Sequence, residues 1–488
     1  MGAILILLVL SIFTSSGFSQ LQSSETGYIS VVISEKGLIF AKDLLIENAI
    51  QTLTALTLPD IHQSKKIPLI GSVSASLTNI TVYHIDVPCS TIQPGESGIA
   101  IAASRATVDL SMNWEYSYST WLIPIPISDK GTASVKVKGM EVGLTVNIQN
   151  QNGTLKLNLV QCGCYMEDIT ITLDGGASWF YQGFVNAFEG QIRSIVETAI
   201  TKKITEGIVK LDSLLQTLPK KINVDKVASL NVTVVNGPLF GNSSVEVDIN
   251  GLFIPSYDDA VIRYLNRNSQ LSDFCDGKLK MLEISLDEDV FNSGSKAYFK
   301  AGLMHWLVDK VPDQSLLNTA SWKYLIPKLY KQYPNDDMEL NLTLSSPPVI
   351  KVTTKNIGVT IRSDMIVNVL DFGVAVPVAC ISVDISATGV PEISGNNLAG
   401  SAQLDDFTLK LKWSTVGNFH MSLIQGVMCV FLDTVFMPYV NLHLRKGFPL
   451  PIIHKLTLEN AVIVTSTSKI IICSDVVSNS SKFMFPSF

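Results

Sequence analysis

The side chains that could bind a metal or act as nucleophiles are dispersed along this 488-residue chain. The sequence has no H-E-x-x-H and no C-x-x-C, the spacings that bring two zinc ligands together on a helix or in a turn. Cys162-Gly-Cys164 is the tightest cysteine pair, but it lacks nearby partners, so we interpret both residues as structural. The serine-hydrolase elbow G-x-S-x-G is also absent. The residue types therefore predict neither a metal centre nor a nucleophilic site.

Phosphate-binding and acid–base motifs give no clearer signal. The chain contains no G-x-G and no G-x-x-x-x-G-K-[ST], so nucleotide chemistry is not expected. The carboxylate pairs Asp336-Asp337 and Asp405-Asp406 lie in turn-like segments, where such side chains usually cap backbone N–H groups. We therefore predict a protein that is not an enzyme and carries no cofactor.

The cysteines indicate an oxidising compartment. Their number is odd, so at least one thiol is free or pairs with another chain. A bridge between Cys162 and Cys164 would be strained, so we expect either of them to reach a distant partner. One or two disulfides are predicted. The seven residues are Cys89, Cys162, Cys164, Cys275, Cys380, Cys429 and Cys473.

The composition describes an apolar, mildly acidic protein. Hydrophobic residues make up 47% of the chain, charged residues 16%, and the mean hydropathy is +0.30, which excludes a disordered chain. The formal net charge is −7, so the electrostatic attraction that dominates nucleic-acid binding is missing. DNA and RNA are not expected partners.

The N-terminus has the pattern of a secretory signal peptide, residues 1–19. An apolar run from Ala3 is followed by the small residues that a signal peptidase requires, ending near Ser19. Further along, the apolar stretch Val427 to Val440 is interrupted by Asp433 and Pro438, so no spanning segment is expected in the mature chain. We predict a secreted, extracellular protein.

Six N-x-[ST] sequons fit that compartment, and about half are expected to carry glycans because single matches also occur by chance. The acceptors are Asn79, Asn152, Asn231, Asn242, Asn341 and Asn479.

Alternation of apolar and polar residues with a period of two recurs along the chain and predicts mainly antiparallel sheet. The clearest runs are 135–138, 155–159, 169–173, 245–249, 340–344 and 407–413.

Four segments have a helical period instead. The longest runs from Ser178 to about Leu218, where Pro219 stops it, and another runs from Met421 to about Leu444. Shorter helices are predicted from Leu38 to Leu58 and from Ser295 to Val308.

The order of a short helix, antiparallel strands and a long helix occurs twice, about 240 residues apart, which indicates two similar domains in tandem. We predict an α+β protein with an N-terminal domain over residues 20–220, a central sheet and linker over 221–290, and a C-terminal domain over 291–488.

The C-terminal part contains the run Leu444-Arg-Lys-Gly-Phe-Pro-Leu-Pro451, followed by an alternating strand. This run resembles the bactericidal/permeability-increasing protein and lipopolysaccharide-binding protein (BPI/LBP) family and is the most specific match to it. Leu325-Ile-Pro327 through Ser346-Pro-Pro348 is similar as well, and Gly37-Leu38 carries the likeness into the first half. The resemblance spans nearly the whole mature chain and is closest to plant-type members.

This resemblance implies an elongated boomerang in which two barrels, each a twisted antiparallel sheet wrapped on a long helix, are joined by a central sheet. It also implies apolar pockets for phospholipid acyl chains and an N-terminal tip that engages the phosphates of lipid A.

The surplus of apolar residues allows each long helix to leave an elongated slot against its sheet, able to hold acyl chains. The predicted lipid-contacting residues are Phe184, Phe188, Ile192, Val135, Val137, Leu155 and Leu157 in the first half and Val427, Phe431 and Val435 in the second.

The predicted headgroup and membrane contacts lie on the N-terminal hairpins. The hairpin near residue 118 is aromatic where mammalian relatives are basic, and amphipathic aromatics favour membrane interfaces. The candidates are Lys65, Lys66 and Lys130 for phosphates and Trp114, Tyr116, Tyr118 and Trp121 for the interface.

The predicted function is binding of lipopolysaccharide and phospholipid in defence against bacteria. Three alternatives stay open: transfer of endogenous membrane lipids, hydrolysis of exported lipids, and a structural role in the cell wall. Substitution of Lys65 and Lys66 distinguishes lipid transfer from the predicted function, because it should weaken lipopolysaccharide binding selectively only under the prediction. Catalytic turnover would indicate the hydrolase, and an absence of extractable lipid would indicate the structural role.

Overall fold

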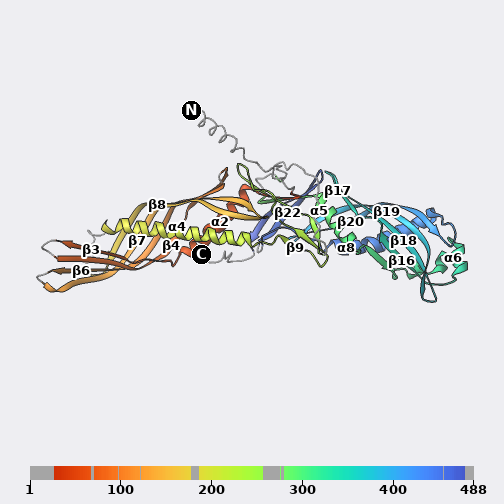
Figure 1. Ribbon diagram of the computed structural model, residues 1–488, viewed down its shortest axis with the longest axis horizontal. Coiled ribbons are helices and arrows are strands. Elements are labelled where there is room, and N and C mark those ends of the chain that lie inside the picture. Colours follow the sequence, from red (N-terminus) through yellow and green to blue (C-terminus); the bar gives the residue numbers. More distant parts are fainter. Residues whose placement is uncertain are drawn as a thin grey trace, which may run out of the picture.

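The computed structural model describes residues 27–67, 71–96, 98–120, 123–176, 186–256, 275, 280–453 and 456–478. The molecule is elongated, with a large sheet and a long helix at each end and a central sheet between them (Figure 1). This arrangement confirms the predicted two-part α+β architecture.

The N-terminal sheet consists of long antiparallel strands in the order β2-β4-β6-β7-β8, with β3 paired to β4 and β5 to β6. Alternate residues of neighbouring strands face the core, as in the register pairs Val135–Ile171 and Val137–Ile169 of β7 and β8. The strands are β2 Thr57–Leu58, β3 Ile61–Ile67, β4 Gly71–Asp86, β5 Cys89–Gly95, β6 Gly98–Thr120, β7 Ile123–Gln151 and β8 Thr154–Asp174.

The long helix α4, Asn186–Gln216, packs against β8 of this sheet. Its buried residues Ile192, Val196 and Ile200 step by four, as one face of a helix requires. The predicted start at Ser178 falls outside the described residues.

The first short helix, α2, spans Glu35–Leu53 and is capped by the Ser34 hydroxyl, which accepts from the Gly37 N–H. It ends five residues before the predicted Leu58. Ala55 has φ 69° and its N–H donates to the Val82 carbonyl, so the chain turns into the sheet there.

The central sheet has the order β11-β12-β1-β14-β23-β22, so it combines strands from both ends of the described chain with strands from the middle. Its strands are β1 Ile29–Ile33, β11 Leu239–Phe240, β12 Val245–Ile249, β14 Leu282–Asp287, β22 Leu456–Ser466 and β23 Lys469–Ser478. A small sheet of β9 Lys221–Asn223, β10 Ala228–Asn231 and β13 Phe253–Pro255 accompanies it.

The C-terminal sheet follows the order β15-β16-β18-β19-β20-β21, with β17 paired to β18. Its strands are β15 His305–Val308, β16 Met338–Leu344, β17 Val349–Val352, β18 Ile357–Asp371, β19 Val374–Ser394, β20 Asn397–Ser414 and β21 Phe448–Pro449. The short helices of this half are α5 Glu288–Lys300, η2 Gln314–Leu317, η3 Thr319–Trp322 and α6 Pro327–Gln332.

Helix α5 begins seven residues before the predicted Ser295 and ends eight before the predicted Val308. The Asp287 carboxylate caps its start by accepting from the Asp289 N–H. At the other end Gly302 has φ 69°, and residues 305–308 form the strand β15.

The second long helix covers Met421–Leu444, as predicted, in three pieces. These are α7 Met421–Phe431, a π-helical turn η4 Leu432–Phe436, and α8 Met437–Leu444. Ile424, Met428 and Phe431 are buried in the core of the C-terminal half. By length and composition alone this helix could cross a membrane, contrary to the prediction of no such segment, but in the structure it packs on the sheet.

One detail of the predicted fold is wrong. In the described chain both large sheets are open paths of strands with two free edges, not closed barrels. In the N-terminal half, α4 lies along one side of its sheet (Figure 1).

Candidate functional site

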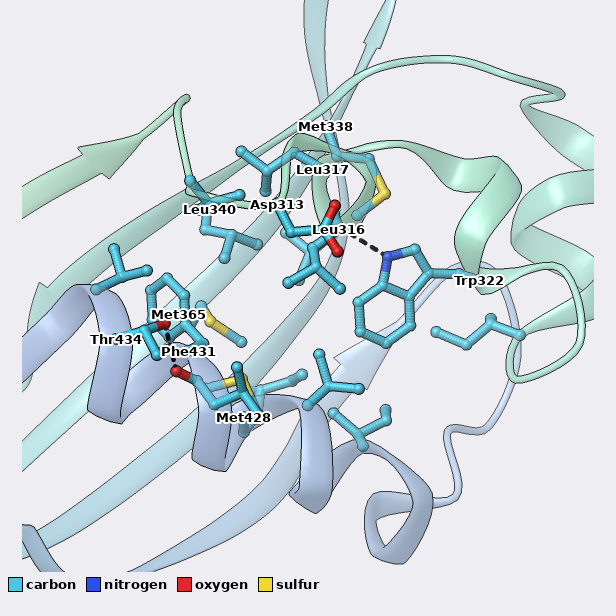
Figure 2. A pocket seen from close by; sticks show the side chains of 18 of the residues that line it. Asp313, Leu316, Leu317, Trp322, Met338, Leu340, Met365, Met428, Phe431 and Thr434 are labelled. Carbon is cyan, nitrogen blue, oxygen red and sulfur yellow. Dashed lines mark hydrogen bonds between the residues drawn. The ribbon is translucent and has the colours of Figure 1, made fainter.

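An apolar cavity of about 210 Å³ lies in the C-terminal half, between the sheet and the long helix. Figure 2 shows side chains from α7, β16 and the 313–322 segment converging on it. Its lining residues are almost all hydrophobic: Val311, Pro312, Asp313, Leu316, Leu317, Trp322, Ile326, Leu329, Met338, Leu340, Met365, Val367, Ile381, Phe419, Ile424, Val427, Met428, Val430, Phe431, Thr434 and Val435.

The sequence periods explain two walls of the cavity. On the sheet, Met338 and Leu340 of β16 lie two residues apart and therefore face the same side, as do Met365 and Val367 of β18. On the helix, the lining residues recur at steps of three and four, which places them on one face. These walls face each other across the space.

The third wall is the irregular segment from Val311 to Trp322. The Trp322 indole N–H donates to the Leu316 carbonyl oxygen at 2.9 Å, which fixes the ring beside the cavity (Figure 2). The Asp313 carboxylate caps the start of η2. It accepts hydrogen bonds from the backbone N–H of Ser315 at 3.1 Å and from the Ser315 hydroxyl at 2.7 Å. Sequence reasoning missed this wall because the segment has no period to reveal it.

Few polar groups face the cavity, and those bond locally. The Thr434 hydroxyl donates to the Val430 carbonyl at 2.7 Å, within the helix. Asp313 is the single ionisable side chain in the lining, and it lies exposed at the rim. With no acid–base pair and no nucleophile among these lining residues, the cavity is suited to holding hydrocarbon.

The volume limits how much hydrocarbon fits. An apolar cavity of ~150 Å³ holds a benzene ring, so 210 Å³ accommodates on the order of ten carbon atoms without rearrangement. Burying that many methylenes gains up to ~8 kcal/mol relative to water at ~0.8 kcal/mol each, and close to nothing relative to a bilayer interior.

Three of the predicted lipid-contacting residues, Val427, Phe431 and Val435, line this cavity. In the N-terminal half, Val135, Val137 and Ile192 are buried in one hydrophobic core cluster and Phe188 packs against it. Leu157 is buried, Leu155 is half-buried, and Phe184 falls outside the described residues. A cavity in that half stays a prediction.

The predicted basic residues lie on the N-terminal sheet. Lys65 and Lys66 on β3 and Lys130 on β7 are exposed. Lys65 pairs in register with Val73 of β4, which pairs with Tyr118 of β6, so β4 lies between β3 and the predicted aromatic strand.

The aromatic candidates differ in how far they are buried. Tyr116 and Tyr118 on β6 are half-buried, and Trp121 falls outside the described residues. Trp114 is only 4% exposed, and its indole N–H donates to the Asp174 carbonyl at 3.1 Å. A membrane contact of Trp114 is incompatible with this burial, since its ring faces the core side of β6.

The cysteine pairing differs from the prediction. The disulfide joins Cys275 to Cys473, whereas Cys162 and Cys164 are both free. Burial raises the pKa of the Cys162 thiol, and burial together with the nearby Glu197 carboxylate and Cys162 raises the pKa of Cys164 to about 12. The described residues contain no group of three potential ligands placed to hold a metal ion.

The sequons differ in accessibility. Asn79, Asn152 and Asn242 are exposed, and Asn231 and Asn341 are half-buried. The Asn231 side-chain oxygen accepts from the Thr233 N–H and hydroxyl. Asn479 lies outside the described residues, and glycosylation of all six stays a prediction.

Comparison with known proteins covers both halves of the chain. Residues 37–218 match the N-terminal domain of the LBP / BPI / CETP family and residues 222–478 match its C-terminal domain. A BPI/LBP family protein of Arabidopsis thaliana is 51% identical over 458 residues, 94% of each chain. Human lipopolysaccharide-binding protein is 23% identical, covering 87% of this chain and 88% of that protein.

The fold agrees with this relationship. A crystal structure of lipopolysaccharide binding protein superposes with a TM-score of 0.67 at 20% identity, covering 93% of this chain and all of that one. Both halves of the chain match the family's domains, and each consists of a sheet and a long helix. The chain is therefore a member of the LBP / BPI / CETP family, a family of lipid-binding proteins.

Proposed function

We propose that this protein is a secreted lipid-binding protein that takes up acyl chains of bacterial lipopolysaccharide and of phospholipids, and that it acts in defence against bacteria. The observation that carries the proposal is the cavity beneath α7, since its lining offers hydrocarbon contact and almost nothing else. We propose binding without turnover, because no catalytic constellation lines this cavity.

Two further observations support lipopolysaccharide as a ligand. Relatives named for lipopolysaccharide binding, in human and cattle, align over 87% and 89% of this chain. The exposed Lys65, Lys66 and Lys130 are among the cations on the N-terminal sheet that are available for lipid phosphates. Charge-assisted bonds from lysine to phosphate are the interaction that such headgroups require.

Secretion is supported by the sequence pattern of residues 1–19 and by the disulfide Cys275–Cys473, which forms in oxidising compartments.

The primary experiment is mass spectrometry of organic extracts from natively purified protein. Lipids bearing acyl chains, in a constant ratio to protein, are expected. Protein that is free of lipid, and that takes up none from solution, contradicts the proposal.

The proposed binding of lipopolysaccharide is tested with the double variant Lys65→Glu/Lys66→Glu. Binding to lipopolysaccharide micelles should weaken about tenfold, while binding to zwitterionic vesicles changes little. Lys355→Glu with Lys410→Glu is the control, because it makes the same change of charge at exposed sites in the C-terminal half. Equal losses on both lipids contradict a phosphate-directed role for Lys65 and Lys66.

Transfer of endogenous membrane lipids is the second candidate, and one observation favours it. The cavity is lined by one carboxylate, Asp313, and by no lysine or arginine, so it provides no cation for the phosphates of lipid A. Under this alternative the protein moves labelled phospholipid between vesicles whether or not lipopolysaccharide is present.

A further inference from the structure

The long C-terminal helix is unusually apolar for an element that is mostly not buried. The most apolar 18-residue stretch within Met421–Leu444 has a mean hydropathy of 1.7, yet only 33% of that stretch is buried. Asp433 is the single Asp, Glu, Lys or Arg in these 24 residues. A helix that served only the protein core would have a charged outer face.

Three of its exposed apolar side chains fall on one line. Leu423 and Val430 are each 54% exposed and lie seven residues, or two helical turns, apart. Leu442 is 64% exposed and follows Val430 by twelve residues. The π-helical turn η4 inserts one extra residue between them, so the twelve residues span three turns and Leu442 returns to the same side.

This line adjoins the opening of the cavity. Val430 and Thr434 line the cavity and belong to the helix surface that is open to solvent. Across the opening lie Pro312 and Asp313, which are also exposed. The cavity therefore opens beside the apolar line, between the helix and the 311–316 segment (Figure 2).

We propose that the outer face of this helix, defined by Leu423, Val430 and Leu442, docks on the surface of a phospholipid bilayer and so places the cavity opening against the acyl chains. This docking rests on the proposed lipid-binding function and adds the route by which lipid enters. This surface lies in the C-terminal half, whereas Lys65 and Lys66 lie on β3 in the N-terminal half (Figure 1).

The chemistry of the face fits a bilayer better than a folded partner. It offers apolar contact with one carboxylate, and the exposed Arg445 and Lys446 follow directly at the C-terminal end of the helix, where they can meet lipid phosphates. The helix lies on the bilayer and does not cross it, because Ile424, Met428 and Phe431 hold its opposite side in the protein core.

The test compares wild-type protein with Leu423→Glu/Leu442→Glu in flotation with phosphatidylcholine vesicles. Neither residue lines the cavity, and both side chains are solvent-exposed, so the fold tolerates the charges. Val160→Glu/Val462→Glu is the matched control, since it adds two carboxylates at sites that are 58% and 52% exposed outside the helix. The helix variant should bind vesicles at least about tenfold more weakly, and the control should bind as wild type does.

A second measurement separates docking from lipid binding itself. Uptake of a monomeric fluorescent lysophospholipid from solution needs the cavity but no bilayer, so both variants should take it up as wild type does. If no variant and no wild-type protein takes up lipid, the proposed function fails.

Three outcomes overturn the docking alone while uptake persists. These are wild-type protein that does not float with vesicles, a helix variant that floats as well as wild type, and sedimentation data in which the helix variant converts a wild-type dimer to a monomer. The last result would assign the face to a second copy of the chain. A helix variant that loses uptake as well would mean that the substitutions act on the cavity and also overturns docking.

Discussion

The Lys36 ammonium lies 2.8 Å from the Asp475 carboxylate, which joins the first turn of α2 to the last strand of the central sheet across 439 residues of chain. The other oxygen of Asp475 accepts from Lys280 at 3.1 Å. One carboxylate therefore links three segments that are remote in sequence.

The first prediction concerns this link. Partial burial of Asp475 raises its pKa, but the hydrogen bonds from Lys36 and Lys280 outweigh that effect and the pKa is lowered. The contribution to stability is therefore complete above the ordinary carboxyl pKa of 3.8 and is lost as the pH falls through the lower folded value. Asp475→Asn should lower the free energy of unfolding at pH 7 by about 1 kcal/mol, measured by urea denaturation.

The difference in unfolding free energy between wild type and Asp475→Asn should become smaller below pH 3.8, because the carboxylate is then increasingly protonated. A difference that stays constant down to acid pH would mean that the carboxylate charge is not what stabilises the junction.

The second prediction concerns the cavity. Val427 is half-buried and lines the cavity from α7, so Val427→Trp should fill much of the space. Lipid recovered per mole of protein should fall about tenfold, while unfolding free energy changes by no more than ~1 to 3 kcal/mol. Mass spectrometry of extracts and thermal denaturation measure the two effects. Val427→Ala, which enlarges the space, is the control and should keep or increase the bound lipid.

The third prediction concerns Trp114. Trp114→Phe keeps an aromatic ring in the core but removes the bond to the Asp174 carbonyl, so stability should fall by about 1 kcal/mol. Vesicle binding should not change, because the ring is buried. A loss of vesicle binding at unchanged stability would contradict this prediction and show that Trp114 contacts the membrane.

The fourth prediction concerns the free thiols. With a pKa near 12, Cys164 is almost wholly protonated at pH 8 and should react slowly with iodoacetamide in the folded protein. Peptide mapping after labelling should find it unmodified, and modified once the protein is unfolded in urea. Rapid native labelling would show that the thiolate is accessible.

Much of the fold could be predicted because its signals are local. The alternation in residues 135–138 and 169–173 reflects strands with one buried face, and the steps of three and four after Met421 reflect a helix packed on one side. The same helical face supplied Val427, Phe431 and Val435, so one wall of the cavity followed from the period alone.

Features that depend on distant partners could not be predicted. The Cys275–Cys473 disulfide has a sequence separation of 198, and no local pattern distinguishes these cysteines from Cys162 and Cys164. The burial of Trp114 was missed because an aromatic strand looks alike whether its tryptophan faces lipid or core. The exact end of α2 precedes Ala55, whose positive φ accompanies a hydrogen bond from its N–H to the Val82 carbonyl of the sheet, a partner that the local sequence does not reveal.

The sequence by itself determined the strand and helix periods and the duplicated order, because each depends on the spacing of neighbouring residues. The resemblance to the family was carried by particular motifs such as Leu444–Pro451. Only the tertiary structure decided where space is left unfilled, which cysteines meet, and which apolar side chains remain outside. Those outcomes depend on how surfaces from remote segments fit together, and close packing is a property of the assembled surfaces and not of any one segment.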